Sequence, residues 1–415
     1  MSDSLVTLMY LTFPSFTEPY LIEVAEALVQ QGKVRAIISA TSPDIAHGAS
    51  NGPSRELRRH IYYLPYNPII HIIKWRFFLD FAHAMISNPR ALMSLISASR
   101  KVRKGLRNAW YHIVRLLPAV PYLRGILHIQ SSGLIKVFPE LLEIDGVDII
   151  VTLRGMETSV TPYYDDVWRG VLTEAVFRRA AILHFVSDFL REEGYRLGAP
   201  RDKAVVIRQS ISERFFTLNG DVRDEDPIPV ILSVGRLVWF KGFQYAIQAA
   251  AILKDRGREF RYLIVGGGEL KPFLQLLIDH LGLRDYIELL GPQSSDGVMT
   301  MLRRASIFLC PSICESLGRQ LMEAQAFGVP VVATNVGGIC DNVSDGETAL
   351  CVPPFEPEKL ADKIEYLMDN PDVAQEMGRA GKTRAQRLFR VKNEVLDLTA
   401  IYSELGNTKA SDGSK

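Results

Sequence analysis

Residues 311–338 read PSICESLGRQLMEAQAFGVPVVATNVGG and place two glutamates, Glu315 and Glu323, in a region that otherwise avoids charge. From residue 305 to residue 340 the only other acidic or basic side chain is that of Arg319. Carboxylates are rarely placed in apolar surroundings without a partner, because burying an unpaired charge is costly. We therefore expect each glutamate to contact either a cation or a polar ligand.

Strand-like runs flank this stretch and predict its local structure. IFLCP, ending at Pro311, and GVPVVATN, residues 328–335, read as buried strands. The segment between them has the length of a helix, with Gly318 near its start and Gly328 at its end, where helices commonly stop. Eight helical residues rise roughly 12 Å, so Glu315 and Glu323 would hold opposite ends of a small extended ligand.

The same segment offers an anion-binding site between Glu315 and Glu323. The amides of Ser316, Leu317, Gly318 and Arg319 would open the helix, and a helix N-terminus attracts negative charge. The alternative is an ion pair of Arg319 with either glutamate at i,i+4 spacing, with a purely structural role. The spacing alone does not decide between these two interpretations.

The composition of the chain is that of an ordinary globular protein. Its 415 residues suggest two domains, and 47% hydrophobic and 23% charged residues support a sizeable core. The four cysteines form no Cys-x-x-Cys pair, so we expect neither disulfides nor zinc and infer a reducing cytosol. The N-terminus lacks the pattern of a signal peptide, and no apolar run reaches 18 residues, so we expect a cytoplasmic protein without a spanning helix.

Strand-like and helical segments alternate in both halves of the chain. The expected strands of the first half are VTLMY, VRAIIS, GILHI, DIIVTL, AILHFVS and AVVIR, and its expected helices cover residues 18–30, 133–142, 166–179 and 188–197. The expected strands of the second half are VILSVGR, RYLIVGGG, YIELLG, SIFLC, VPVVAT and ALCVP. This alternation predicts an α/β fold of two Rossmann-like, doubly wound domains that face each other across a cleft. Ligands of such sheets bind at the carboxyl ends of the strands.

The domain boundaries follow from breaks in this alternation. We expect an N-terminal domain at residues 1–216, a linker at residues 217–229 and a C-terminal domain at residues 230–390. Residues 391–415 would form a terminal helix that packs back on the N-terminal domain, followed by a frayed tail.

One part of the first half is basic and aromatic. Residues 58–139 hold thirteen Lys and Arg but a single acid, Asp80. Aromatic residues are interleaved with these cations, namely Trp75, Phe77, Phe78, Trp110 and Tyr111. This composition favours a helical insertion that lies on an anionic membrane surface. A solvated insertion with core aromatics and a nucleic-acid patch are the alternatives, and no nucleic-acid motif supports the latter.

Two glycine-containing motifs follow strands of the second half. SVGRLVWFKGF places Arg236 and Lys241 after a strand, and Gly235 allows the backbone to approach closely. Two cations at the end of a strand suit a diphosphate. LIVGGGELKPF is a second turn, through Gly266, Gly267 and Gly268, but it matches neither a G-x-G-x-x-G fingerprint nor a phosphate-binding loop.

The motifs of the second half, taken in order, closely resemble the C-terminal domain of glycosyltransferase family 4, whose members are retaining enzymes of the GT-B fold. These motifs are SVGRL…KG, VGGGEL and PSICESLGRQLMEAQAFGVPVVAT…GG. The resemblance runs from about Val230 to Phe389 and is specific because separate motifs keep their order and spacing. The first half resembles the family more weakly. FPSFTEPYLIEVAEAL is similar to the FPxxSETFIxxEIxxL opening of members that build bacterial exopolysaccharides, and VTLRGMET to the family's TxHGxD strand end.

The resemblance implies transfer of a sugar from a nucleotide donor with retained configuration. Because no DxD-like motif stands in a suitable place, we expect the reaction to need no metal. The resemblance assigns Glu315 to the hydroxyls of the donor sugar, and the amides of residues 316–319 to sugar and phosphate. Arg236 and Lys241 would neutralise the departing diphosphate, and Glu323 would bind the ribose. Gly266, Gly267 and Gly268 would lie near the base.

The first half departs from the family pattern at positions near the donor sugar or the acceptor. Arg154 stands before Gly155 where a histidine is usual, and Gln130 replaces the second histidine of an H-x-H pattern. His128, the first of that pattern, remains, either at the site or as a strand histidine that faces the core. Glu18 would also lie on the acceptor or donor side.

The resulting hypothesis is a glycosyltransferase of cell-surface polysaccharide synthesis that acts on a lipid-linked glycan at the cytoplasmic membrane face. Two alternatives remain open from the sequence. One is another GT-B enzyme, such as a nucleotide-sugar epimerase or a phosphorylase, although neither signature is present. The other is a nucleotide-sugar-binding protein without transfer activity, which the replacements at Arg154 and Gln130 favour.

Overall fold

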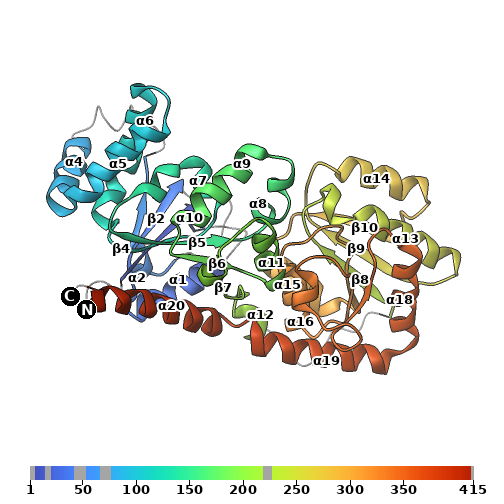
Figure 1. Cartoon of the computed structure of the whole chain (residues 1–415). Coiled ribbons are helices and arrows are strands. Elements are labelled where there is room, and N and C mark those ends of the chain that lie inside the picture. The colour runs from blue at the N-terminus through green and yellow to red at the C-terminus, as the bar shows by residue number, and fades with distance from the viewer. Residues whose placement is uncertain (1–4, 15–19, 42–52, 66–75, 218–226, 413–415) are drawn as a thin grey trace. The chain divides into compact units, whose positions relative to one another are not determined.

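The computed structural model describes residues 5–14, 20–41, 53–65, 76–217 and 227–412. Its contacts divide the chain into two compact units (Figure 1). Unit 1 comprises Met1–Gln209 and Val391–Lys415, and unit 2 comprises Ser210–Arg390. The first boundary precedes the one expected at residue 216, because Phe215 packs on Phe327 of unit 2 with ring centroids 5.9 Å apart. Of the expected linker, residues 218–226 lie outside the described part of the chain.

Unit 1 contains a parallel sheet with strand order β3-β2-β1-β4-β5-β6-β7. The strands are β1 Val6–Thr12, β2 Val34–Thr41, β3 Ile61–Tyr63, β4 Gly125–Ile129, β5 Val147–Leu153, β6 Ile182–Phe185 and β7 Ala204–Val206. Its longer helices are α1 Tyr20–Gln30, α4 Arg76–Ser87, α5 Pro89–Val102, α6 Leu106–Leu116, α11 Asp188–Arg196 and α20 Val391–Asp412. Short helices are α2 Arg55–Arg58, α7 Gly133–Val137, α8 Met156–Ser159, α9 Asp166–Gly170 and α10 Phe177–Arg179.

The C-terminal helix α20 belongs to the core of unit 1. Val395, Leu398 and Tyr402 of α20 are buried together with Leu21 and Leu28 of α1. Helix α20 packs on α1, and the two lie side by side in Figure 1. The chain thus returns to its first unit after completing the second.

Unit 2 contains a second parallel sheet, with strand order β10-β9-β8-β11-β12-β13. The strands are β8 Val230–Val234, β9 Arg261–Val265, β10 Ile287–Gly291, β11 Ile307–Cys310, β12 Val331–Thr334 and β13 Ala349–Val352. The helices are α12 Arg214–Thr217, α13 Phe243–Asp255, α14 Lys271–His280, α15 Ser295–Arg304, α16 Arg319–Ala326, α17 Ile339–Asn342, α18 Pro357–Asp369 and α19 Pro371–Leu388. The expected α/β class with two Rossmann-like sheets is confirmed.

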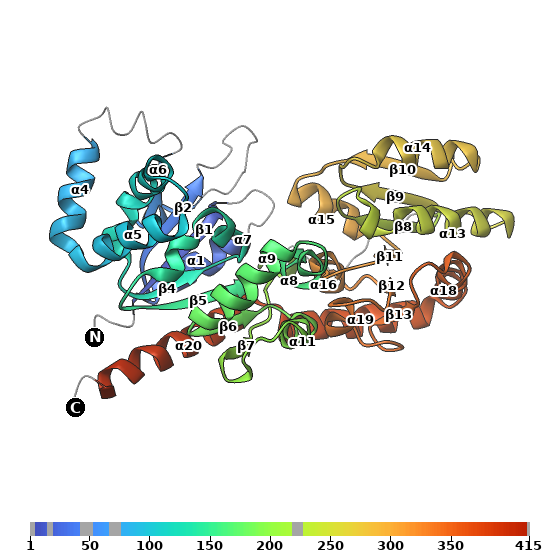
Figure 2. The ribbon, with the colours of Figure 1, turned by 45° about the horizontal axis from the view of Figure 1, so that its top comes forward.

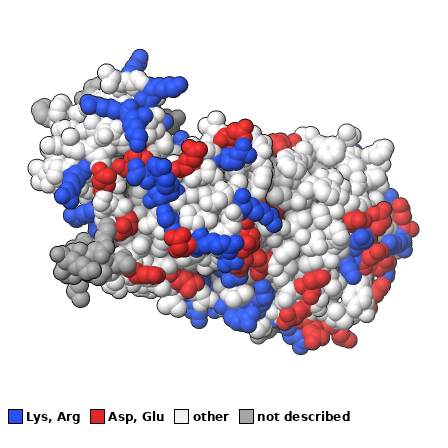
Figure 3. Space-filling view, in the orientation of Figure 1, with Lys and Arg blue, Asp and Glu red and all other residues white. Residues whose placement is uncertain are grey.

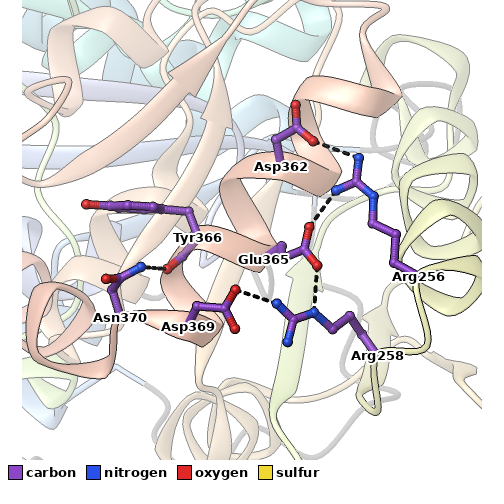
Figure 4. Close-up of polar contacts among 7 residues, drawn as sticks. All are labelled: Arg256, Arg258, Asp362, Glu365, Tyr366, Asp369 and Asn370. Carbon is purple, nitrogen blue, oxygen red and sulfur yellow. Dashed lines mark hydrogen bonds and ion pairs between the residues drawn. The ribbon is translucent and has the colours of Figure 1, made fainter.

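An ion-pair network ties the turn after α13 to helix α18 (Figure 4). Arg256 bonds Asp362 at 2.8 Å and Glu365 at 2.6 Å. Arg258 donates from Nε to the same Glu365 carboxylate at 2.6 Å and also bonds Asp369. Exposed single pairs stabilise little, but a shared carboxylate makes these contacts a network. The network thus links α18 to the turn that precedes strand β9.

Several expected elements of unit 1 need correction. The helix expected at residues 133–142 is two pieces, α7 and a 3₁₀ segment Pro139–Glu143, because Pro139 cannot continue the helical hydrogen bonding. The span 58–139 is not wholly a helical insertion, since it contains the strands β3 and β4 of the sheet. Its inserted helices are α4, α5 and α6, grouped at one end of unit 1 in Figure 2. In the described part of the chain, no helix has the length and apolar character to cross a bilayer.

Candidate functional site

Two loops at the carboxyl ends of β8 and β11 are joined by close backbone contacts. Gly242 has φ 68°, and a Cβ there would overlap the carbonyl oxygen of Pro311, so only glycine permits this approach. The carbonyl of Phe240 accepts hydrogen bonds from the amides of Ile313 at 2.8 Å and Cys314 at 3.3 Å. The loop that carries Lys241 is therefore fixed against the loop that carries Glu315.

Lys241 and Glu315 form a nearly buried ion pair at this junction. The Lys241 ammonium donates to Glu315 Oε2, and the two side chains are 11% and 13% exposed. Gln320 Nε2 donates to the same oxygen at 3.1 Å. Burial alone would raise the pKa of Glu315, but the charge of Lys241 and hydrogen bonds from Lys241, Gln320 and the Gly318 amide lower it overall. Glu315 is thus held as a carboxylate, ready to accept hydroxyl hydrogen bonds.

Glu315 precedes helix α16. The expectation that one helix spans both Glu315 and Glu323 is therefore wrong. Helix α16 begins at Arg319, and Gly318 adopts φ 77° just before it. A left-handed residue ends regular helical geometry, so residues 315–318 form a loop. The amide of Gly338 donates to the Glu315 carbonyl at 2.8 Å, and Asn342 Nδ2 donates to the Leu317 carbonyl. These contacts hold the loop in place.

Glu323 sits on α16 with Arg319 as its partner. Arg319 Nε lies 3.4 Å from Glu323 Oε1, which is the i,i+4 ion pair considered as the structural alternative. Burial raises the pKa of Glu323, and the charge of Arg319 lowers it by less. An ionised carboxylate offers about four acceptor positions, so Glu323 can accept further hydrogen bonds beside this ion pair.

The glycine turn after β9 lies against the loop after β8. Cβ atoms at Gly266 and Gly268 would overlap the carbonyl oxygens of Gly235 and Leu237. The amide of Leu237 donates to the Gly267 carbonyl at 2.9 Å. The guanidinium of Arg236 lies 5.6 Å from the ring centroid of Phe240. The structure thus gathers the sequence-predicted residues Arg236, Lys241, Gly235 and Gly266–Gly268 at one edge of the sheet of unit 2.

Some residues that support this edge were not singled out from the sequence. Gln320 and Asn342 hold Glu315 and the loop after it, as described above. Trp239 is 54% exposed beside the predicted diphosphate residues and contacts Phe240 edge-on at 5.7 Å. Gly338 was part of the quoted motif. A Cβ at this position would overlap the Ser316 carbonyl, which explains why a glycine stands there.

In unit 1, His128 is a core residue and not a surface ligand. Its side chain is fully buried, with Nδ1 2.7 Å from Tyr402 Oη and Nε2 2.7 Å from Thr152 Oγ1. Thr152 Oγ1 also lies 3.0 Å from His184 Nδ1, and His184 Nε2 lies 3.1 Å from the Ile207 carbonyl. Both ring nitrogens of each histidine are engaged, so the core interpretation of His128 holds.

The residues that follow β4 and β5 form a separate polar cluster. Arg154 donates from Nη2 to Gln130 Oε1 and from Nη1 to Tyr20 Oη, each at 3.1 Å. Gly155 follows with φ 80°. Glu18 lies outside the described residues. Within the described part of the chain, no group of three or more His, Cys, Asp or Glu could hold a metal ion.

Known proteins resemble this chain in sequence. Residues 221–384 match the family model for glycosyl transferases group 1. Alpha-D-kanosaminyltransferase of Streptomyces kanamyceticus is 29% identical over 67% of this chain and 76% of that protein. A protein named as a colanic acid biosynthesis glycosyltransferase, WcaL of Escherichia coli (strain K12), is 32% identical over 57% of either chain.

Solved structures share the fold of the whole chain. Sucrose-phosphate synthase from Thermosynechococcus elongatus superposes with a TM-score of 0.71 at 19% identity, over 97% of this chain and 99% of that one. Anabaena Alr3699/HepE in complex with UDP and glucose gives a TM-score of 0.67 at 16% identity, over 96% and 99%. Residues 221–384 are therefore similar to the glycosyl transferases group 1 family, and both units share their fold with solved structures that include a sucrose-phosphate synthase.

Proposed function

We propose that this protein is a retaining glycosyltransferase that moves a sugar from a nucleoside diphosphate sugar to a glycan acceptor of cell-surface polysaccharide synthesis. The observation that carries the proposal is the Lys241–Glu315 pair at the carboxyl edge of the sheet of unit 2. It joins a cation and a hydroxyl acceptor at the place where parallel sheets bind ligands. The Anabaena protein of similar fold holds UDP and glucose in its structure, which supports a donor of this class.

In the proposed reaction an acceptor hydroxyl attacks the anomeric carbon from the face that the diphosphate leaves. The bond from that carbon to the phosphate oxygen breaks, and the leaving phosphate takes the acceptor's proton. Negative charge develops on the diphosphate, where Arg236 and Lys241 would stabilise it. Lys241 carries three N–H donors and can therefore hold Glu315 and a phosphate oxygen together.

The remaining groups would position the donor. Glu315 would accept hydrogen bonds from sugar hydroxyls, and Glu323 from the ribose. The amides of Ser316, Gly318 and their neighbours would face sugar and phosphate. We propose that no metal is needed, because these cations and amides supply the positive field at the diphosphate. We further propose a lipid-linked acceptor, bound by unit 1 at the cytoplasmic membrane face.

Incubation with a panel of UDP- and GDP-sugars and a lipid-linked acceptor tests the proposal. We expect one donor to yield free nucleoside diphosphate and a product heavier by one sugar in mass spectrometry. NMR of the product should show the anomeric configuration of the donor, and turnover should persist in a chelator. Inversion, or complete dependence on a divalent cation, would contradict the corresponding part of the mechanism.

A nucleotide-sugar-binding protein without transfer activity is the second candidate. Arg154 and Gln130 favour it, because they stand where the family resemblance expects histidines. Donor binding by calorimetry without product from any donor in the panel would support this candidate over the transferase.

A further inference from the structure

Helix α4 of unit 1 turns an apolar face outward. Leu79 is 68% exposed and Ile86 83% exposed, and Phe78 and Met85 lie on the same exposed side. The opposite side carries Ala84, which is fully buried. A surface helix of a globular protein normally shows the reverse pattern, with its apolar stripe toward the core. Contiguous exposed apolar surface of this kind marks an interaction site.

Helix α6 packs beside α4 and exposes apolar side chains of its own. Phe77 of α4 lies 6.2 Å from Trp110 of α6, measured between ring centroids. Trp110 is 44% exposed, and Leu106 at the start of α6 is 78% exposed. We call the exposed side chains of α4 and α6, with the turn at residues 103–105, the α4–α6 face. Tryptophan and tyrosine suit the boundary between lipid and water, because they combine an apolar body with a polar tip.

Cations border this apolar surface. Arg100, Lys104 and Arg107 are exposed on or beside the turn that joins α5 to α6. From residue 76 to residue 116 the only acidic residue is Asp80, which is half-buried. Figure 3 shows basic side chains gathered over the end of unit 1 that carries α6, next to an uncharged surface over α4.

We propose that the α4–α6 face docks the protein on an anionic phospholipid bilayer. Exposed apolar side chains would enter the boundary between head groups and acyl chains, and the bordering cations would bind phosphate head groups. An acidic protein surface would match the cations, but it offers no comparable medium for Phe78, Leu79 and Ile86. The docking stands by itself, whereas delivery of a lipid-linked acceptor to unit 1 also rests on the proposed function.

Vesicle flotation with the full chain tests the docking. We expect the protein to float with vesicles of phosphatidylcholine and phosphatidylglycerol at low salt, and not with phosphatidylcholine alone. Replacing two apolar residues, Leu79→Glu with Ile86→Glu, should lower the partition coefficient at least tenfold. The matched control is Leu276→Glu with Leu396→Glu, at positions 68% and 69% exposed elsewhere, and it should float like wild type.

A second pair of changes tests the role of charge. Lys104→Gln with Arg107→Gln should weaken binding to the anionic vesicles by about fivefold per cation. The proposal fails if wild type stays in the soluble fraction, if the α4 variant floats like wild type, or if neutral and anionic vesicles bind equally. It also fails if the α4–α6 face captures a labelled oligonucleotide but no vesicles.

Thermal unfolding checks that each variant is folded, since all four substituted side chains of the test variants are exposed. Transfer to a soluble acceptor analogue separates the two proposals. Flotation without any transfer would leave the docking intact and contradict the transferase, and transfer without flotation would do the opposite.

Discussion

The guanidinium of Arg154 donates from Nη2 to the side-chain oxygen of Gln130 at 3.1 Å. These are the two positions at which histidines are usual in the family that the sequence resembles. They follow the adjacent strands β5 and β4, so the two replacements contact each other directly. Each of the two replaced residues therefore has the other as its hydrogen-bond partner, and we interpret the two replacements as one coupled change.

This coupling is measurable in a double-mutant cycle. Arg154→Ala and Gln130→Ala should each lower the free energy of unfolding by about 1–2 kcal/mol, because each removes the hydrogen bond between the buried Gln130 and the half-buried Arg154. The double variant should lose less than the sum by about 1 kcal/mol. Urea denaturation of the four proteins gives the coupling energy. The control combines Gln130→Ala with Arg100→Ala, which changes an exposed residue, and the two losses of stability should add. The pairing is contradicted if the losses from Arg154→Ala and Gln130→Ala add as well.

The architecture was predictable because each strand is encoded locally. Runs such as VILSV, at Val230–Val234, are rich in β-branched residues and end at glycine, and they appear as strands of the expected sheets. Strand β3 was missed because its three residues, Ile61–Tyr63, carry too short a pattern, and its place depends on pairing with β2. Pro139 did signal the break between the two helical pieces, but the apolar pattern on both sides concealed it.

The candidate site was predictable in its residues but not in their pairing. Lys241 and Glu315 lie 74 residues apart, so only the fold reveals their ion pair. Gly318 was recognised near the start of a helix, yet its left-handed backbone, which removes Glu315 from that helix, has no unique sequence signal. The roles assigned to Arg236, Glu315 and Glu323 in donor binding stay predictions.

Lys241 is expected to act on the leaving group as well as on Glu315. Lys241→Ala should lower kcat/KM about 10²–10³-fold, the usual cost of removing one preorganised donor. Because it also leaves Glu315 without its cation and so raises the pKa of that carboxyl, stability should fall. Lys241→Met with Glu315→Gln separates the two effects, since it should recover stability without recovering turnover. Lys254→Ala, which removes a lysine bonded only to backbone carbonyls in its described contacts, is the control.

An unchanged kcat/KM in Lys241→Ala would remove this residue from the site. A loss that the double variant fully recovers would show that Lys241 acts only through the fold. Steady-state kinetics with the donor varied, together with thermal unfolding of each variant, distinguish these outcomes.

Glu323 is expected to recognise the ribose hydroxyls. Calorimetry of the preferred nucleoside diphosphate and its 2′,3′-dideoxy analogue should show at least tenfold weaker binding of the analogue to wild type. Glu323→Ala should bind the two ligands equally, because the hydroxyl acceptor is gone. Glu288→Ala, at an exposed carboxylate of β10, should behave as wild type. Equal discrimination by wild type and Glu323→Ala would leave only the ion pair with Arg319 as the role of Glu323.

The buried hydrogen-bond chain of unit 1 has a direction set by its last member. The Ile207 carbonyl can only accept, so His184 Nε2 donates and its Nδ1 accepts the Thr152 hydroxyl. Thr152 Oγ1 then accepts from His128 Nε2, and His128 Nδ1 accepts from Tyr402. Every member is satisfied only while both imidazoles are neutral.

Acid should therefore destabilise unit 1 before its carboxylates are titrated. Burial lowers the pKa of His184 to about 4; the Ile207 carbonyl opposes this shift, and the charge of Arg154 adds to it. The folded state then binds fewer protons than the unfolded state, whose histidine has a pKa near 6.5. Stability should be complete above pH 6.5 and fall by on the order of 3 kcal/mol as the pH drops to 4. Urea denaturation across this range measures the loss, and His184→Gln should reduce its slope, whereas His83→Gln, at an exposed position, should not. A wild-type stability that stays constant between pH 6.5 and pH 4.5 would contradict a neutral, proton-excluding chain from Tyr402 to Ile207.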